Sequence, residues 1–336
     1  MFDKPCIKKI VVVILVLFLI PAFHVSADFY VISGSHGSGK EIKSLPYTIS
    51  EPGFYFIRKN LNSGGAGIIV EADHVTIDLM GFVLTGPGAG NNHGVYMNGR
   101  SNVEIRNGTV TNFGKYGIYE QSQSSGRDHR ILNIRSTLNN GGGIYLYGKS
   151  AQIENCTASE NLGSGIFAGQ ASKVTGNTAR VNEGDGIYGN GGNLIYNNVC
   201  RENVGNGIFA AAGSTVTQNT LYNNAQNGIS TGDGCTVTHN TSSFNLMSGI
   251  DASSSSWAGS IVSHNTCYDN TNHGIVVGNC VQVRNNTVYY NDFDGISLKY
   301  NSFVDGNLAY DNNQSGGSFS NISSCTGCTF GTNLAP

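Results

Sequence analysis

The stretch NGIFAAAGSTVTQNTLYNNAQNGISTGDGCTVTHNTSSFN, residues 206–245, repeats itself after 21 residues. Asn-Gly-Ile at 206–208 returns at 227–229, and Thr-Val-Thr-x-Asn-Thr at 215–220 returns at 236–241. The glycine, isoleucine, valine and asparagine keep their places while nearly everything between them changes. A repeat of this period indicates a solenoid in which successive units stack on one another.

The same repeat extends through most of the chain. The glycine of a Gly-Ile pair recurs at Gly117, Gly143, Gly165, Gly186, Gly207, Gly228, Gly249, Gly274 and Gly295, with Gly67-Ile68 and Gly94-Val95 as looser members. One asparagine column holds Asn177, Asn198, Asn219, Asn240, Asn265, Asn286 and Asn307, and a second holds Asn161, Asn182, Asn203, Asn224, Asn245, Asn270, Asn291 and Asn312. Between these positions lie short β-branched or aromatic segments bounded by turn residues, which is typical of short strands. We predict an all-β fold in which each unit of three strands closes one coil.

The columns have different roles in such a coil. Strands of neighbouring coils pair in parallel, so equivalent residues stack about 4.8 Å apart. The isoleucine after each glycine, a Val/Ile column and a small apolar column that includes Cys200 and Cys267 are expected to point inward. We interpret the asparagines as structural, because stacked amides hydrogen-bond from coil to coil and tolerate the left-handed backbone of tight turns.

The ends of the chain differ from the repeats. Lys4, Lys8 and Lys9 precede an apolar run at 10–20, and Val-Ser-Ala at 25–27 suits a signal peptidase, so residues 1–27 are predicted to be a signal peptide. A retained N-terminal anchor is the alternative. We expect a secreted, periplasmic or cell-surface protein, with an N-terminal cap and first strands at 28–66, β-helix repeats at 67–313 and a C-terminal cap at 314–336.

The amino-acid composition limits which binding partners we expect. A formal charge of -3, with 12% charged residues among 336, offers no basic surface for nucleic acid. No stable membrane span is expected after signal cleavage, and we expect a monomer. Cys325 and Cys328 are interpreted as a local disulfide or free thiols rather than a metal site, since a single CxxC is weak evidence for zinc.

Three further segments carry a family resemblance: SLPYTISEPGFYFIRKNL (44–61), VTIDLMGFVLTG (75–86) and NVEIRNGTVTNFG (102–114). Together with the repeats, they resemble exported proteins with right-handed parallel β-helix repeats of the pectin-lyase-like superfamily. The resemblance covers about residues 40–315 and implies a right-handed, single-stranded parallel β-helix of about ten or more coils. It implies polysaccharide lyases, hydrolases and epimerases, but also non-catalytic surface proteins and NosD-like periplasmic proteins linked to copper-site maturation.

The residue after each Gly-Ile or Gly-Val pair is expected to face outward, and it is aromatic in six successive coils. The predicted substrate-binding residues are these six aromatics: Tyr96, Tyr119, Tyr145, Phe167, Tyr188 and Phe209. In the later coils the same column holds Ser230, Asp251, Val276 and Ser297. Six coils give a strip about 24 Å long. The rings either shield the sheet and stabilise neighbouring coils or form a platform for sugars. In the resembled enzymes the corresponding sheet face lines the substrate groove.

Beyond the aromatics the same face becomes polar. Asp251, His273, Asp294 and Lys299 are candidate catalytic residues, with the carboxylates as acid, base or Ca²⁺ ligands. The alternative is that His273 and Asp294, each directly before a Gly-Ile pair, are ordinary turn residues. Trp257, the only tryptophan, is a further candidate for binding in a longer loop.

Two histidines offer a further candidate site, and the signature motifs of several known enzymes are absent. His239 and His264 occupy equivalent positions in adjacent coils and form either a metal site or a polar ladder. Asp-Pro-His, Asp-Asp, Gly-His-Gly, Arg-Ile-Lys and Arg-x-Pro signatures do not occur. We therefore favour a polysaccharide-binding solenoid; the alternatives are a lyase, hydrolase or epimerase of acidic glycans, and a NosD-like metal-site maturation protein.

Overall fold

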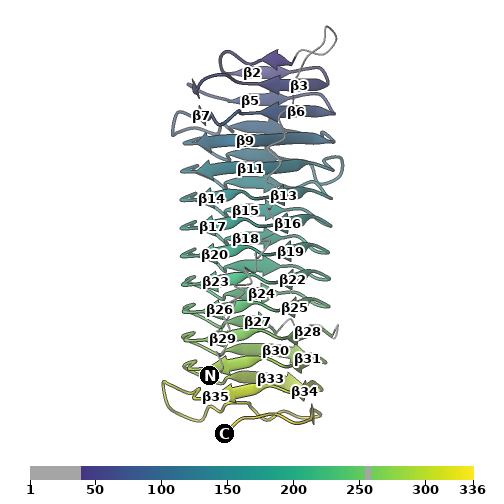
Figure 1. Ribbon diagram of the computed structural model, residues 1–336, viewed down its shortest axis with the longest axis vertical. Helices are drawn as coiled ribbons and strands as arrows, with labels where there is room; N and C mark the ends of the chain where they lie inside the picture. Colours follow the sequence, from purple (N-terminus) through teal and green to yellow (C-terminus); the bar gives the residue numbers. More distant parts are fainter. Residues whose placement is uncertain (1–38, 254–258) are drawn as a thin grey trace, which may run out of the picture. The chain divides into compact units, whose positions relative to one another are not determined.

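The structure is a computed structural model that describes residues 39–253 and 259–336, and Gly39–Pro336 forms one compact unit (Figure 1). The predicted signal peptide at 1–27 and Trp257 lie outside the described residues. Within the described ranges all regular elements are strands, arranged in one 12-stranded and one 24-stranded sheet. No helix long and apolar enough to cross a membrane occurs in this part of the chain.

The 12-stranded sheet takes one strand from each coil. Its members are β2 (Tyr47–Ile49), β5 (Ile68–Val70), β8 (Val95–Met97), β10 (Ile118–Glu120), β12 (Ile144–Leu146), β15 (Ile166–Ala168), β18 (Ile187–Gly189), β21 (Ile208–Ala210), β24 (Ile229–Thr231), β27 (Ile250–Ala252), β30 (Ile275–Asn279) and β33 (Ile296–Tyr300).

The 24-stranded sheet contains the remaining strands. They are β1 (Lys40–Glu41), β3 (Gly53–Phe56), β4 (Leu61–Asn62), β6 (Val75–Asp78), β7 (Val83–Thr85), β9 (Val103–Thr111), β11 (Arg130–Thr137), β13 (Gln152–Glu154), β14 (Thr157–Ser159), β16 (Lys173–Thr175), β17 (Thr178–Arg180), β19 (Leu194–Tyr196), β20 (Val199–Arg201), β22 (Thr215–Thr217), β23 (Thr220–Tyr222), β25 (Thr236–Thr238), β26 (Thr241–Ser243), β28 (Ile261–Ser263), β29 (Thr266–Tyr268), β31 (Gln282–Arg284), β32 (Thr287–Tyr289), β34 (Phe303–Asp305), β35 (Leu308–Tyr310) and β36 (Thr329–Phe330).

One coil consists of three short strands, as β18, β19 and β20 illustrate (Figure 1). Each strand pairs in parallel with its equivalent in the next coil, so that Ile187 lies opposite Ile208 in the register of β18 and β21. The predicted parallel solenoid of 21-residue coils is confirmed.

The glycine column recurs because neighbouring coils approach too closely there for any side chain. A Cβ atom on Gly186 would lie 2.6 Å from the carbonyl oxygen of Gly207 in the next coil, and one on Gly207 would lie 2.6 Å from that of Gly228. Neither glycine has a positive φ, so the requirement is steric rather than conformational.

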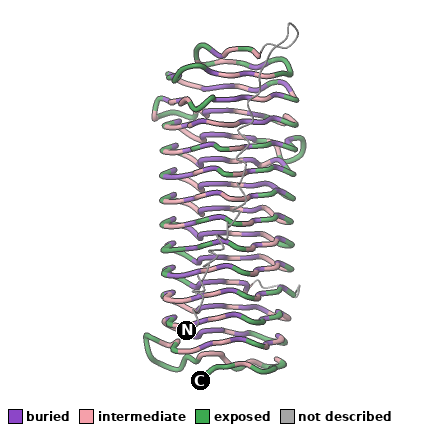
Figure 2. The backbone as a smooth tube through the Cα atoms, viewed as in Figure 1, coloured by how far each residue is buried: buried purple, intermediate pink, exposed green. Residues whose placement is uncertain are grey.

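The predicted inward columns form the core. Ile187, Ile208 and Val216 are completely buried, and the buried residues run as a continuous interior from coil to coil (Figure 2). Burying an aliphatic side chain of this size contributes about 1.5–3 kcal/mol. Because every coil repeats the same contribution, the core extends the length of the solenoid instead of forming one central cluster.

Both asparagine columns are buried hydrogen-bond ladders, as predicted. Asn198 donates from Nδ2 to the carbonyl of Val174 (2.9 Å) and to Oδ1 of Asn219 (3.0 Å), while its own Oδ1 accepts the backbone N–H of Asn177 (2.9 Å). The prediction that these asparagines adopt the left-handed backbone is wrong by one residue. The positive φ lies on the preceding residue, such as Asn197 at 55°, because the ladder asparagine must point its amide into the turn.

The cysteines fall into two classes. Cys200 and Cys267 are completely buried core residues three coils apart, as expected. Burial raises the pKa of both thiols, which keeps them in the unreactive protonated form. Cys325 and Cys328 form a disulfide in the C-terminal segment.

Candidate functional site

The outward residues of six adjacent strands in the 12-stranded sheet form a continuous row of rings. Each is half-buried between two inward neighbours, which confirms the predicted outward register. We call this row the aromatic strip, and its members are Tyr96, Tyr119, Tyr145, Phe167, Tyr188 and Phe209.

The strand spacing sets the geometry of the strip. Ring centroids lie 4.2 Å apart between Tyr145 and Phe167, 4.9 Å between Phe167 and Tyr188, and 4.7 Å between Tyr188 and Phe209. The rings of the first two pairs are tilted by only 11°. Toward Tyr96 the separations widen to 5.6 and 5.9 Å. The strip therefore presents a row of rings that runs from coil to coil, stacked from Tyr145 to Phe209 and interrupted by a tilt of 57° between Tyr119 and Tyr145.

Three further aromatic residues widen the strip at its N-terminal end. His93 stacks 4.5 Å from Tyr119, and Tyr116 stacks 4.6 Å from the same ring. Tyr147, two residues after Tyr145 on the same face, lies 6.2 Å from it. The sequence analysis missed His93 and Tyr116, although both occupy the column directly before the repeated glycine.

Packing makes this end of the strip electrically neutral apart from one lysine. Burial raises the pKa of Tyr145 to about 12, and burial together with Lys115 lowers the pKa of His93 to about 4. At neutral pH the phenols keep their protons and the imidazole carries no charge. Lys115 places its Nζ 5.6 Å from the Tyr116 ring and 5.9 Å from the Tyr119 ring, so a cation lies beside the rings.

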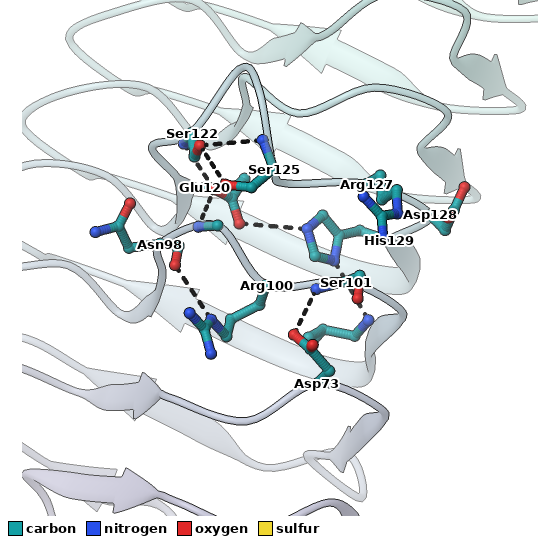
Figure 3. A network of polar contacts seen from close by, with 12 residues as sticks. Asp73, Asn98, Arg100, Ser101, Glu120, Ser122, Ser125, Arg127, Asp128 and His129 are labelled. Atoms are coloured by element: carbon teal, nitrogen blue, oxygen red, sulfur yellow. Dashed lines mark hydrogen bonds and ion pairs between the residues drawn. The ribbon is translucent and has the colours of Figure 1, made fainter.

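A loop at 121–128 borders the strip, and a buried contact between a carboxylate and an imidazole anchors it (Figure 3). Tyr96 donates its hydroxyl proton to Oε1 of Gln121 at 2.9 Å, which joins the strip to the loop. Beneath the loop, Glu120 accepts the N–H groups of Gly99 (2.9 Å) and Ser122 (2.7 Å).

His129 completes this anchor. Glu120 and His129 are both completely buried, and Glu120 Oε2 lies 3.3 Å from His129 Nε2. His129 Nδ1 accepts the N–H of Val103 at 3.3 Å, so its proton sits on Nε2 and faces the carboxylate. Burial opposes the charge of Glu120, but His129 and the two backbone donors outweigh it and hold the pKa of Glu120 below its usual value. Neither side chain is accessible, so the pair positions the loop rather than meeting a ligand.

Three of the four candidate catalytic residues lie on adjacent coils, as the register predicts. His273 Nδ1 lies 3.4 Å from Asp294 Oδ2, and Asp251 is close enough to influence the pKa of His273. Each, however, is hydrogen-bonded to a backbone N–H: His273 Nδ1 accepts from Asp294 (3.1 Å), Asp294 from Ser320 (2.8 Å) and Asp251 from Ser253 (2.9 Å).

This bonding pattern limits what the group can do. The lone pair of His273 Nδ1 is occupied, and burial lowers the pKa of His273 although both aspartates oppose that shift. The ring is therefore neutral at pH 7, with its proton on Nε2, and it offers a donor rather than a base. Lys299 points its Nζ to the carbonyl of Ser253 at 3.4 Å.

The two stacked histidines belong to a turn ladder. His239 and His264 have ring centroids 5.0 Å apart with an interplanar angle of 6°, and both have φ near 57°. His239 Nδ1 contacts the hydroxyl of Thr238 at 2.7 Å, and His264 Nε2 contacts Asn285 Nδ2 at 3.2 Å. Among residues 39–253 and 259–336, no group of three or more His, Cys, Asp and Glu side chains is arranged to hold a metal ion.

Comparison with known proteins agrees with this architecture. The family described as "Right handed beta helix region" matches residues 93–242. The A-module of the mannuronan C-5 epimerase AlgE6 from Azotobacter vinelandii superposes with a TM-score of 0.58 at 16% identity, covering 85% of this chain and 91% of that one. A comparison with curated protein sequences finds no match.

Two other solved structures are similar over most of this chain. A double mutant of the periplasmic alginate epimerase AlgG gives a TM-score of 0.53 at 12% identity, covering 85% of this chain and 76% of that one. The Dettilon tailspike protein gives 0.50 at 16% identity, covering 84% and 60%. The fold is thus a right-handed parallel β-helix, shared with these solved structures.

Proposed function

We propose that this protein binds polysaccharide along the aromatic strip and that it does so without a standard catalytic set. The observation that carries the proposal is the continuous row of six half-exposed rings on one face of the 12-stranded sheet, in which every neighbouring pair except Tyr119 and Tyr145 is stacked. Nothing in the register of the fold requires an aromatic at this position, because Ser230, Val276 and Ser297 occupy it in later coils.

The chemistry of the strip suits a sugar chain. Flat rings offer apolar faces to the C–H surfaces of sugar rings, and the phenol groups of Tyr119 and Tyr145 remain protonated donors at neutral pH. Lys115 adds a cation at the N-terminal end, which favours an acidic glycan. Two of the structures that share the fold are named for mannuronan and alginate.

The test measures binding of the purified protein to alginate, polygalacturonate and a neutral glucan by calorimetry. Each stacking ring contributes on the order of 1 kcal/mol, so Tyr145→Ala together with Tyr188→Ala is expected to weaken binding about 30-fold. The matched control is Tyr145→Phe with Tyr188→Phe, which keeps both rings and is expected to retain most of the affinity. Full affinity in the double alanine variant, with unchanged thermal stability, refutes the proposal.

The same samples test the enzymatic alternative. New unsaturated or reducing ends, or a changed uronate composition, that disappear in Asp251→Ala and in His273→Ala would replace binding by catalysis. The occupied lone pair of His273 Nδ1 favours the binding function.

A further inference from the structure

A second row of aromatic rings lies on the 24-stranded sheet, away from the aromatic strip. Tyr268, Tyr289 and Tyr310 are opposite one another in the register of β29, β32 and β35. Their ring centroids are 5.1 and 5.2 Å apart, with interplanar angles of 2° and 6°. This row was not predicted from the sequence.

A surface hollow of about 400 Å³ lies beside this second row. Phe244 and Tyr290, both more than 40% exposed, contribute aromatic rings to its wall. Asp269 and Asp292 contribute carboxylates, and Thr271 and Gln314 contribute a hydroxyl and an amide. A hollow of this size matches the lower range of small-ligand sites.

The same two columns in earlier coils show what the hollow lacks. There the outward column carries Arg180 and Arg201, and these pair with Glu160 (3.4 Å) and Glu202 (2.8 Å). Glu160 and Glu202, which occupy the column of Asp269, therefore each have an arginine partner.

In later coils the arginines give way to aromatic rings, and an acidic residue returns at Asp269 without an arginine beside it. Arg201 lies opposite Tyr222, and the column continues through Ser243 to Tyr268. Asp269 follows Tyr268 just as Glu202 follows Arg201. No lysine or arginine in the described ranges forms an ion pair with Asp269 or Asp292. The hollow combines two uncompensated carboxylates with two exposed rings, and both features attract an organic cation.

We infer that this acidic hollow binds an amino sugar that carries a free ammonium group. The ammonium group lies between the carboxylates of Asp269 and Asp292, and beside Asp269 it takes the place that Arg201 fills beside Glu202. The rings of Phe244 and Tyr290 supply an apolar wall for the sugar ring, and Thr271 and Gln314 supply partners for its hydroxyls. The site is independent of the aromatic strip. The strip lies on the other sheet, and its charged neighbour is the cation Lys115 rather than a carboxylate.

The experiment compares glucosamine, glucose, N-acetylglucosamine and methylguanidinium as ligands, followed by NMR shifts of the purified protein. Glucosamine is expected to bind in the millimolar range, more weakly in high salt, and glucose and N-acetylglucosamine are expected not to saturate. Asp269→Asn and Asp292→Asn should each weaken glucosamine binding about threefold to fivefold. Tyr268→Arg supplies the arginine of the earlier coils and should weaken binding to a similar degree.

Controls separate this site from the strip. Glu202→Gln removes a carboxylate that already has its arginine, and Tyr145→Ala with Tyr188→Ala removes rings from the strip; both should leave glucosamine binding unchanged. Equal binding of glucose and glucosamine, or no response to Asp269→Asn and Tyr268→Arg, would overturn the inference. Tighter binding of methylguanidinium than of glucosamine would also overturn it, because the occupant would then be a guanidinium group rather than a sugar.

Discussion

Replacing one ladder asparagine, in Asn198→Ala, should destabilise the solenoid far more than its size suggests. Asn198 is 1% exposed, and its Oδ1 is the acceptor for both the backbone N–H and the Nδ2 of Asn177, at 2.9 and 3.0 Å. Alanine leaves that N–H buried without its partner, strands one amide proton of Asn177, and removes a donor from the carbonyl of Val174. At the low end of the usual cost of about 1–3 kcal/mol for each unsatisfied buried group, these three groups give an expected loss in the free energy of unfolding of at least about 3 kcal/mol.

The neighbouring residue provides a matched control. Asn197 is exposed with a φ of 55°, so Asn197→Gly keeps the left-handed turn and breaks no buried hydrogen bond. Its unfolding free energy should stay within about 0.5 kcal/mol of wild type. Urea unfolding gives both values, and hydrogen exchange should show the loss of protection centred on the coils around Asn198. A loss below about 1 kcal/mol in Asn198→Ala, or one equal to that of Asn197→Gly, would show that the ladder amides are not the source of stability.

Three other changes test the fold and its electrostatics. His93 has a pKa of about 4 in the folded protein and about 6.5 in the unfolded chain, so the stability of the wild type should fall as pH drops from about 6.5 to about 4. In His93→Phe the urea midpoint should depend less on pH in that window. Identical pH profiles of the two proteins would contradict this. Glu120→Gln should cost about 3 kcal/mol at pH 7, because its amide faces the Nε2–H of His129. Since the pKa of Glu120 is depressed, that difference should shrink as pH falls below about 4, and a pH-independent difference would argue against an ionised Glu120 in the folded protein. Gly207→Ala should lower the unfolding free energy by about 1–3 kcal/mol, whereas Gly64→Ala, where an added Cβ meets nothing within 4 Å, should leave it nearly unchanged.

Repetition explains why so much of the fold is predictable from the sequence. A single coil would leave the register ambiguous, but the glycine, isoleucine and asparagine of one coil must contact their equivalents in the next. That constraint identified the inward columns and the outward position of Tyr145 correctly. It did not locate the left-handed residue, because Asn197 and Asn198 are the same residue type and only their hydrogen bonds distinguish them.

The repeat pattern could not predict features that occur only once in the chain. Glu120 replaces the aliphatic residues that other coils place at the same inward position, and its partner His129 lies across the loop at 121–128, so no column relates the two. The acidic hollow escaped notice for a different reason. Its significance depends on whether Asp269 has a basic neighbour in space, which the columns alone do not reveal. The catalytic role of His273 stays a prediction.

The equal length of successive coils has a consequence for how such a surface changes in evolution. Ile166, Ile187 and Ile208 stack at a constant interval of 21 residues. Removing residues 187–207 would therefore place Phe209 directly on Phe167, and the residues of the other columns would still stack on their equivalents. Duplicating that segment would add one ring. Loss or gain of a single repeat thus shortens or extends the aromatic strip by about 4.8 Å and leaves both ends of the protein as they were.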